Sequence, residues 1–202
     1  MCVYFIGRKS TEKIADVSAE TGKSHPKTGI CLNFAVHTAG RHPGCHAYTL
    51  YIIYMTYDYQ DIRMEPCRDY EGMTRVWLAA VRATHHFLSE EDIDFYHKRL
   101  PDLYMPHVDL YAIRNARGEC RAFIGLSQEM VEMLFVHPDD MGKGYGSMLL
   151  RFACRGRGIR RVDVNEQNER ALGFYLHHGF SITGRDATDS EGKPYPILHL
   201  SM

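Results

Sequence analysis

The chain has 202 residues, 45% of them hydrophobic and 24% charged, which is enough for one globular domain with a full core and spare length for an appendage. Its formal net charge of −1 excludes a global field that would attract nucleic acid or an anionic membrane. The cysteines are scattered without a C-x-x-C pair, and no apolar run comes near the ~20 residues of a membrane span. We therefore expect a reduced cytoplasmic protein that binds neither nucleic acid nor a membrane.

The first part of the chain, residues 1–54, shows no sustained helical or strand period. Regular patterns begin after it, so we expect an N-terminal extension over residues 1–54 and a folded domain over residues 55–202. Two hypotheses stay open for the extension: it is loosely ordered, or it lies upstream of the true start at Met55. It contains potential zinc ligands, namely Cys31, His37, His42, Cys45 and His46. Their order and spacing match no zinc motif, so we expect loop residues there.

From residue 58 the patterns predict a strand, two helices, three strands, a helix, a strand, a helix and two strands. "YQDIRM" (59–64) alternates like a strand. One apolar helical face follows, formed by Met73, Val76, Trp77, Ala80 and Val81. Ser89, with Asp92 three residues later, marks the start of a second helix. Residues 108–114, 121–127 and 130–136 then predict an antiparallel meander, because short turns join them.

A glycine-rich loop, "VHPDDMGKGYGSMLL" (136–150), leads from the last of these strands into a helix. Unpaired backbone N–H groups and the positive end of the helix dipole converge at such a place, which predicts an anion site. A Walker A loop is excluded because Lys143 precedes Gly144 rather than Ser or Thr. A Rossmann loop fits poorly, since the glycines Gly142, Gly144 and Gly146 alternate after an antiparallel meander.

The loop resembles the pyrophosphate loop of the GNAT superfamily of N-acetyltransferases, which has V-x-P-x-x-(Arg/Gln)-x-x-G-x-G. The matching residues are Val136, Pro138, Met141, Gly144 and Gly146. A second stretch, "VDVNEQNERALGFYLHHGF" (162–180), is similar to the family's N-x-x-A-x-x-x-Y segment and its following G-F. "VNEQN", "GKPYPILHL" and "ATHHFLS" resemble the YjaB-like branch of bacterial acetyltransferases. The resemblance covers about residues 58–202 and leaves the extension unexplained.

The resemblance implies an α/β (α+β) GNAT fold: a mixed, mostly antiparallel sheet of six to seven strands, splayed between strands 4 and 5 and flanked by about four helices. It also implies acetyl-CoA as cosubstrate, without a metal, bound in that splay. The implied cofactor-binding residues are Leu134, Phe135, Val136, Met141, Gly142, Lys143, Gly144, Tyr145, Gly146, Asn165 and Asn168. Met141 replaces the family's Arg or Gln, so we expect weaker cofactor binding. Asn168 either bonds the cofactor or caps the next helix.

Three residues carry the chemistry that the resemblance implies. Tyr175 occupies the position of the general acid that protonates the departing CoA thiolate, and a phenol keeps its proton at neutral pH. Glu132 is the candidate base for the acceptor amine, or else it points to a solvated sheet surface with Leu134 and Val136. His85, at the end of the first helix, lies where the family builds its acceptor groove, and structural histidines are the competing case.

Two classes of function fit these residues. The first is an enzyme that moves an acetyl group from acetyl-CoA to a primary amine, on a protein lysine or a small molecule. The second is a non-catalytic sensor of acetyl-CoA or CoA. A short basic run, formed by Arg155, Arg157, Arg160 and Arg161, either contacts the 3′-phosphate of CoA or is a solvated connection. The chain is expected to be a monomer or a homodimer.

Overall fold

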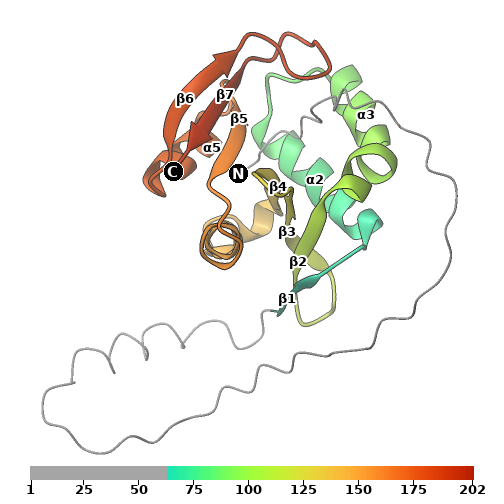
Figure 1. Ribbon diagram of the computed structural model, residues 1–202. Helices are drawn as coiled ribbons and strands as arrows, with labels where there is room; N and C mark the ends of the chain where they lie inside the picture. The colour runs from blue at the N-terminus through green and yellow to red at the C-terminus, as the bar shows by residue number, and fades with distance from the viewer. Residues whose placement is uncertain (1–62) are drawn as a thin grey trace, which may run out of the picture. The chain divides into compact units, whose positions relative to one another are not determined.

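The computed structural model describes residues 63–202 (Figure 1). The potential zinc ligands, Met55 and the whole extension lie outside the described residues, as does most of the strand expected over residues 59–64. Within the described part, the strands are β1 (Arg63–Pro66), β2 (Asp109–Arg114), β3 (Cys120–Leu126), β4 (Val131–Val136), β5 (Arg161–Asn165), β6 (Ser181–Asp186) and β7 (Ile197–Ser201). The α-helices are α2 (Tyr70–Thr84), α3 (Glu90–Arg99), α4 (Tyr145–Arg151) and α5 (Glu169–His177).

The seven strands form one sheet in the order β1-β2-β3-β4-β5-β7-β6. All neighbours are antiparallel except β4 and β5, which run parallel and pair only at Val131 and Val162 among the described residues. Beyond this pair the two strands separate toward their carboxyl ends, so the sheet has two halves (Figure 1). The prediction of a mixed, mostly antiparallel GNAT-type sheet with a split between strands 4 and 5 is confirmed.

Strand β4 contains a β-bulge at Glu132. Leu126 on β3 faces Val131, whereas Gly125 faces Met133, so Glu132 is the extra residue on β4. The bulge changes the phase of the side chains: Val131 lies on the same face as Leu134, and not on the face of Met133. Strict alternation therefore does not hold at Glu132, and it no longer assigns this side chain to the face of Leu134.

Helices α2 and α3 cover one face of the β1–β4 half. The predicted apolar face of α2 is confirmed, since Met73, Val76, Trp77, Ala80 and Val81 are all buried. Trp77 packs on Phe135 of β4, with ring centroids 6.4 Å apart, and Phe135 stacks on Phe123 of β3 at 5.4 Å. The predicted start of α3 is also confirmed, because the hydroxyl of Ser89 accepts a hydrogen bond from the Asp92 N–H at 3.1 Å.

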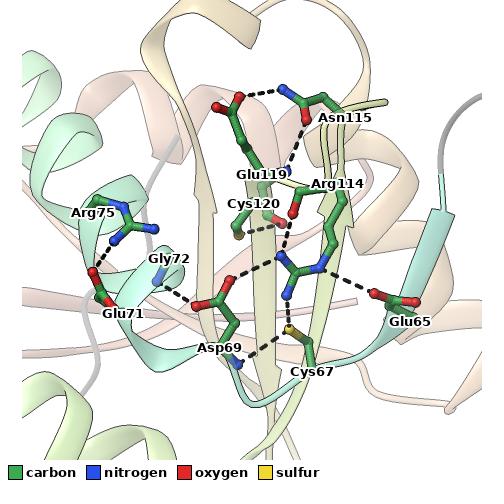
Figure 2. Close-up of polar contacts among 12 residues, drawn as sticks. Glu65, Cys67, Asp69, Glu71, Gly72, Arg75, Arg114, Asn115, Glu119 and Cys120 are labelled. Atoms are coloured by element: carbon green, nitrogen blue, oxygen red, sulfur yellow. Dashed lines mark hydrogen bonds and ion pairs between the residues drawn. The ribbon is translucent and has the colours of Figure 1, made fainter.

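The chain enters α2 through a polar cluster that Figure 2 shows. The guanidinium of Arg114, on β2, donates to Glu65 at 3.2 Å, to Asp69 at 3.0 Å and to the Cys67 sulfur at 2.9 Å. Asp69 in turn caps α2 by accepting from the Gly72 N–H at 2.8 Å. This bond, with help from Arg114, holds the pKa of Asp69 below its ordinary value. The cluster fixes edge strand β1 and the start of α2 to β2.

Candidate functional site

The glycine-rich loop lies where β4 leaves the sheet at its split. A 3-10 turn, Pro138–Asp140, follows β4, and α4 begins at Tyr145. Gly142 and Gly144 both have a φ of +85°, a left-handed conformation that favours glycine. Gly144 is the N-cap of α4, so the first N–H groups of that helix, which have no intrahelical acceptor, point into the loop. The loop thus has the backbone geometry of an anion site.

A buried carboxylate holds the loop in this shape. Asp140, 6% exposed, accepts from Arg121 Nε at 2.6 Å and from Lys143 Nζ at 2.9 Å. Burial acts to raise the pKa of Asp140, but the bonds from Lys143 and Arg121 outweigh it and keep that pKa below its ordinary value. The charge of Lys143 is therefore directed at Asp140, within the loop.

A cavity of about 200 Å³ lies over the loop. The loop lines one side of it through Met141, Gly142, Gly144 and Gly146, and α5 lines the other through Arg170 and Phe174. Arg170 has no ion pair among residues 63–202. An arginine thus meets this cavity from α5, although Met141 stands where the family motif has Arg or Gln.

Sequence reasoning missed Arg170, although the sequence carries a signal. Arg170 lies in the first turn of α5, immediately after Glu169. The positive end of a helix disfavours a cation in its first turn, and the cost is typically a few tenths of a kcal/mol or more. A cation that the dipole of its own helix disfavours indicates an anionic partner outside that helix.

The opening between β4 and β5 begins just beyond the Val131–Val162 pair. Within residues 63–202, Leu134, Phe135 and Val136 pair with β3 on one side only, and their side chains are buried. Because β5 does not continue the ladder, backbone groups of these residues that point away from β3 face the opening. Glu132, half-buried in the bulge, lies next to Val131 at the point where the strands part.

Two buried asparagines shape the far side of this opening, at the end of β5. The Asn165 Oδ1 accepts from the Gln167 N–H at 2.9 Å. The Asn168 Oδ1 accepts from the Ala171 N–H at 3.0 Å, so Asn168 is the N-cap of α5. The capping alternative for Asn168 is therefore observed, and its amide nitrogen points to a different neighbour.

That neighbour is His85, which is 1% exposed at the end of α2. Its Nε2 lies 3.3 Å from the Asn168 Nδ2, and its Nδ1 lies 3.0 Å from the Thr84 hydroxyl. Thr84 donates its own proton to the Ala80 carbonyl at 2.8 Å. The consistent arrangement therefore has the proton on Nδ1, with Nε2 accepting from Asn168. Burial lowers the pKa of His85 to about 3, so the ring is neutral at pH 7 and links α2 to the start of α5.

Tyr175 lies on the buried face of α5 and is 0% exposed. Its ring packs edge-on against Phe174 at 5.1 Å and Phe180 at 5.5 Å. It belongs to the same apolar cluster as Leu134 and Val136 of β4. The structure thus brings Tyr175, β4 and the glycine-rich loop to the α4–α5 side of the sheet, whereas His85 reaches the site from α2.

Between residues 63 and 202, no helix has the length and apolar character to cross a membrane. In the same part of the chain, no group of three or more His, Cys, Asp or Glu side chains is arranged to hold a metal ion.

Comparison with known proteins identifies the family of this chain. Residues 107–182 match the acetyltransferase (GNAT) domain family. The chain is 38% identical over 143 residues to the peptidyl-lysine N-acetyltransferase YjaB of Escherichia coli K12, covering 69% of this chain and 95% of that protein. The Salmonella typhimurium YjaB is 36% identical over 143 residues, covering 69% and 96%.

Solved structures agree with this. The solution structure of apo YjaB from Escherichia coli has a TM-score of 0.64 at 37% identity, covering 69% of this chain and 96% of that one. The PaiA N-acetyltransferase of Thermoplasma acidophilum, crystallised with coenzyme A, has the same fold with a TM-score of 0.54 at 20% identity, covering 71% and 100%. The chain belongs to the GNAT family and is an N-acetyltransferase.

Proposed function

We propose that this enzyme moves the acetyl group of acetyl-CoA to a primary amine, on a protein lysine or a small molecule. One observation carries the proposal: the glycine-rich loop and Arg170 line the same cavity, which also reaches Val136 at the end of β4. The name of the Escherichia coli relative, a peptidyl-lysine N-acetyltransferase, supports lysine as the acceptor.

The residues present fit the cofactor. Backbone N–H groups at the start of α4, together with Arg170, would bind the pyrophosphate, and Lys143 would act on Asp140 to keep the loop in shape. The backbone of Leu134, Phe135 and Val136 offers groups for the amide bonds of the pantetheine arm along the edge of β4. Donors fixed in that strand would also stabilise negative charge on the thioester oxygen.

Protons must leave the acceptor amine, and one proton must reach the departing thiolate. A lysine-like amine has a pKa of ~10.4 and reacts only when neutral, so a base must take its proton, and we assign this to Glu132, directly or through water. The neutral amine nitrogen attacks the thioester carbonyl carbon, and the nitrogen gives up a second proton to water as the carbon–sulfur bond breaks. Tyr175 gives its proton to the departing thiolate, and the phenolate regains a proton from water. No covalent bond to the enzyme forms, so one transfer completes the reaction.

His85 has a positioning role in this proposal. A buried imidazole with a pKa of about 3 is a poor base at neutral pH. Its bonds to Asn168 and Thr84 instead hold the start of α5 against the end of α2. This fixes the helix that carries both Arg170 and Tyr175.

Titration calorimetry and a turnover assay test the proposal together. Acetyl-CoA is titrated into the full chain, and acetylation of lysine peptides and polyamines is then followed by mass spectrometry. We expect binding and an amine product 42 Da heavier, the mass of one acetyl group in place of a proton. Binding without any product would favour the sensor, and no binding of acetyl-CoA would overturn both.

An Arg170→Ala variant should bind acetyl-CoA about 10-fold more weakly, since one charge-assisted hydrogen bond is worth roughly 1.5–3 kcal/mol and part of it is screened at this exposed position. Arg117→Ala is the matched control, because Arg117 is an exposed arginine in the β2–β3 turn. Calorimetry on both variants decides the point. Equal affinities would remove Arg170 from the phosphate site.

A further inference from the structure

A cavity of about 430 Å³ lies at the end of the sheet where β4 and β5 begin. It is lined by the turn between β3 and β4, through Gln128, and by the segment before β5, through Ile159. These two segments lead into Val131 and Val162, the described pair at which β4 and β5 meet. The cavity therefore lies at the closed base of the β4–β5 opening, roughly 17 Å along β4 from the start of the glycine-rich loop.

Two opposite charges line this cavity without pairing. The Asp109 carboxylate, at the start of β2, and the Arg157 guanidinium belong to exposed residues, and neither forms an ion pair within residues 63–202. By contrast, Arg161 of β5 pairs with Glu129 of the β3–β4 turn at 3.1 Å, close to the same place. Opposite charges that share a cavity but stay apart favour a ligand that carries both signs of charge.

Two aromatic rings hold the guanidinium of Arg157. Its Cζ lies 5.2 Å from the ring centroid of Tyr111 and 5.8 Å from that of Phe152, and these two rings are 4.7 Å apart. A guanidinium over an aromatic face keeps the N–H groups of its edge available, and these can bind a carboxylate through two parallel hydrogen bonds. Tyr111 and Asp109 are two residues apart on β2 and share a face of the sheet, so Arg157 lies on the side that carries Asp109.

The other residues that line the cavity are of two kinds. Leu126 and Ile159 are apolar and buried, in the same cluster as the β4 residues Leu134 and Val136. His107 and Gln128 are exposed, and their side chains form no hydrogen bond with another residue of the described range. The cavity thus combines an apolar floor with unused polar groups, and its volume is within the range of small-molecule sites.

We propose that this cavity binds a free α-amino acid with an apolar side chain. The carboxylate of the ligand bonds to Arg157, its ammonium group bonds to Asp109, and its side chain covers Leu126 and Ile159. A bound amino acid joins β2 and the β3–β4 turn to the segment before β5, and so braces the two halves of the sheet where they meet. The cavity shares no lining residue with the one over the glycine-rich loop, so this inference goes beyond the proposed function and does not depend on it.

The test uses L-leucine as the probe, titrated by calorimetry into the full chain without acetyl-CoA. We expect a Kd below about 1 mM. L-Leucinamide, which lacks the carboxylate, and N-acetyl-L-leucine, which lacks the ammonium group, should each bind at least about 10-fold more weakly. Glycine should also bind more weakly than leucine, because it has no side chain to cover the apolar floor. Leucine should raise the melting temperature of the protein, since it binds the folded state.

Variants distinguish this cavity from the acceptor site, because leucine is itself a primary amine. Asp109→Asn and Arg157→Ala should each weaken leucine binding at least about 10-fold. Their melting temperatures without leucine should equal that of the wild type, which shows that both variants fold. Asp102→Asn and Arg117→Ala are the matched controls, because both residues are exposed and lie outside the cavity, and they should bind leucine as the wild type does.

Three results would overturn the inference. If leucine binds the wild type and both cavity variants with the same Kd, it occupies another site. If leucinamide binds as tightly as leucine, the carboxylate is not recognised and the assignment of a zwitterion is wrong. If neither leucine, methionine, valine nor phenylalanine binds the wild type, the cavity has no amino-acid ligand of this kind. None of these results affects the proposed function, which is tested by acetyl-CoA binding and by the acetylated amine.

Discussion

A Tyr175→Phe variant is expected to turn over at least about 100-fold more slowly and to bind acetyl-CoA as tightly as the wild type, because positioned general acids contribute 10²–10⁴-fold. The substitution removes one oxygen and keeps the ring. The packing of that ring against Phe174 and Phe180 is therefore preserved. What is lost is the proton that the thiolate would take as the carbon–sulfur bond breaks.

The measurement needs kcat and affinity separately. Release of free CoA thiol gives kcat at saturating acetyl-CoA, and calorimetry gives Kd. Tyr111→Phe is the matched control, because it deletes one hydroxyl from a tyrosine on β2 that packs against Phe152. A Tyr175→Phe enzyme with wild-type kcat would contradict the acid role, since solvent would then supply the proton. A variant that loses affinity instead would make Tyr175 a structural residue.

The parts of the fold that the sequence predicted depend on local chemistry. The apolar residues of α2 recur with helical spacing, and Ser89 caps α3 with its own hydroxyl. Both features can be predicted from the local sequence, because neither depends on a distant segment of the chain. The bulge at Glu132 is different. It exists only in the pairing of β4 with β3, where Leu126 and Gly125 face Val131 and Met133, and nothing in the six residues of β4 announces it.

The candidate site divides along the same line. The loop motif could be recognised from the sequence because its glycines lie within a few residues of one another. Two of them, Gly142 and Gly144, have a positive φ. Arg170 and His85 depend on contacts made across the fold. His85 meets Asn168, 83 residues later in the chain, and a short stretch ending in two histidines cannot reveal which of them will be buried. His85 is buried and His86 is exposed.

The burial of His85 leads to a second expected result: this residue lowers the free energy of unfolding as the pH falls below 6.5. Its pKa is about 3 in the folded state, against about 6.5 for an unperturbed histidine. Between these values the unfolded chain binds a proton that the folded chain excludes, so stability falls as the pH falls through this range and is unaffected above it. A pH of 5 is about 1.5 units below 6.5, so proton uptake by the unfolded chain lowers the free energy of unfolding by roughly 2 kcal/mol there.

Urea unfolding of the wild type and of His85→Gln at pH 7.5 and pH 5.0 measures how much His85 contributes to the change in the free energy of unfolding with pH. Glutamine retains hydrogen-bonding groups for Thr84 and Asn168 but does not titrate, so this variant should lose about 2 kcal/mol less between the two pH values. His107→Gln, which removes an exposed imidazole, should behave as the wild type does. NMR titration of the His85 ring in the wild type gives the same answer without a variant. A ring that gains its proton near pH 6.5 would mean that His85 meets solvent, which would return it to the acceptor side of the reaction as a titrating group.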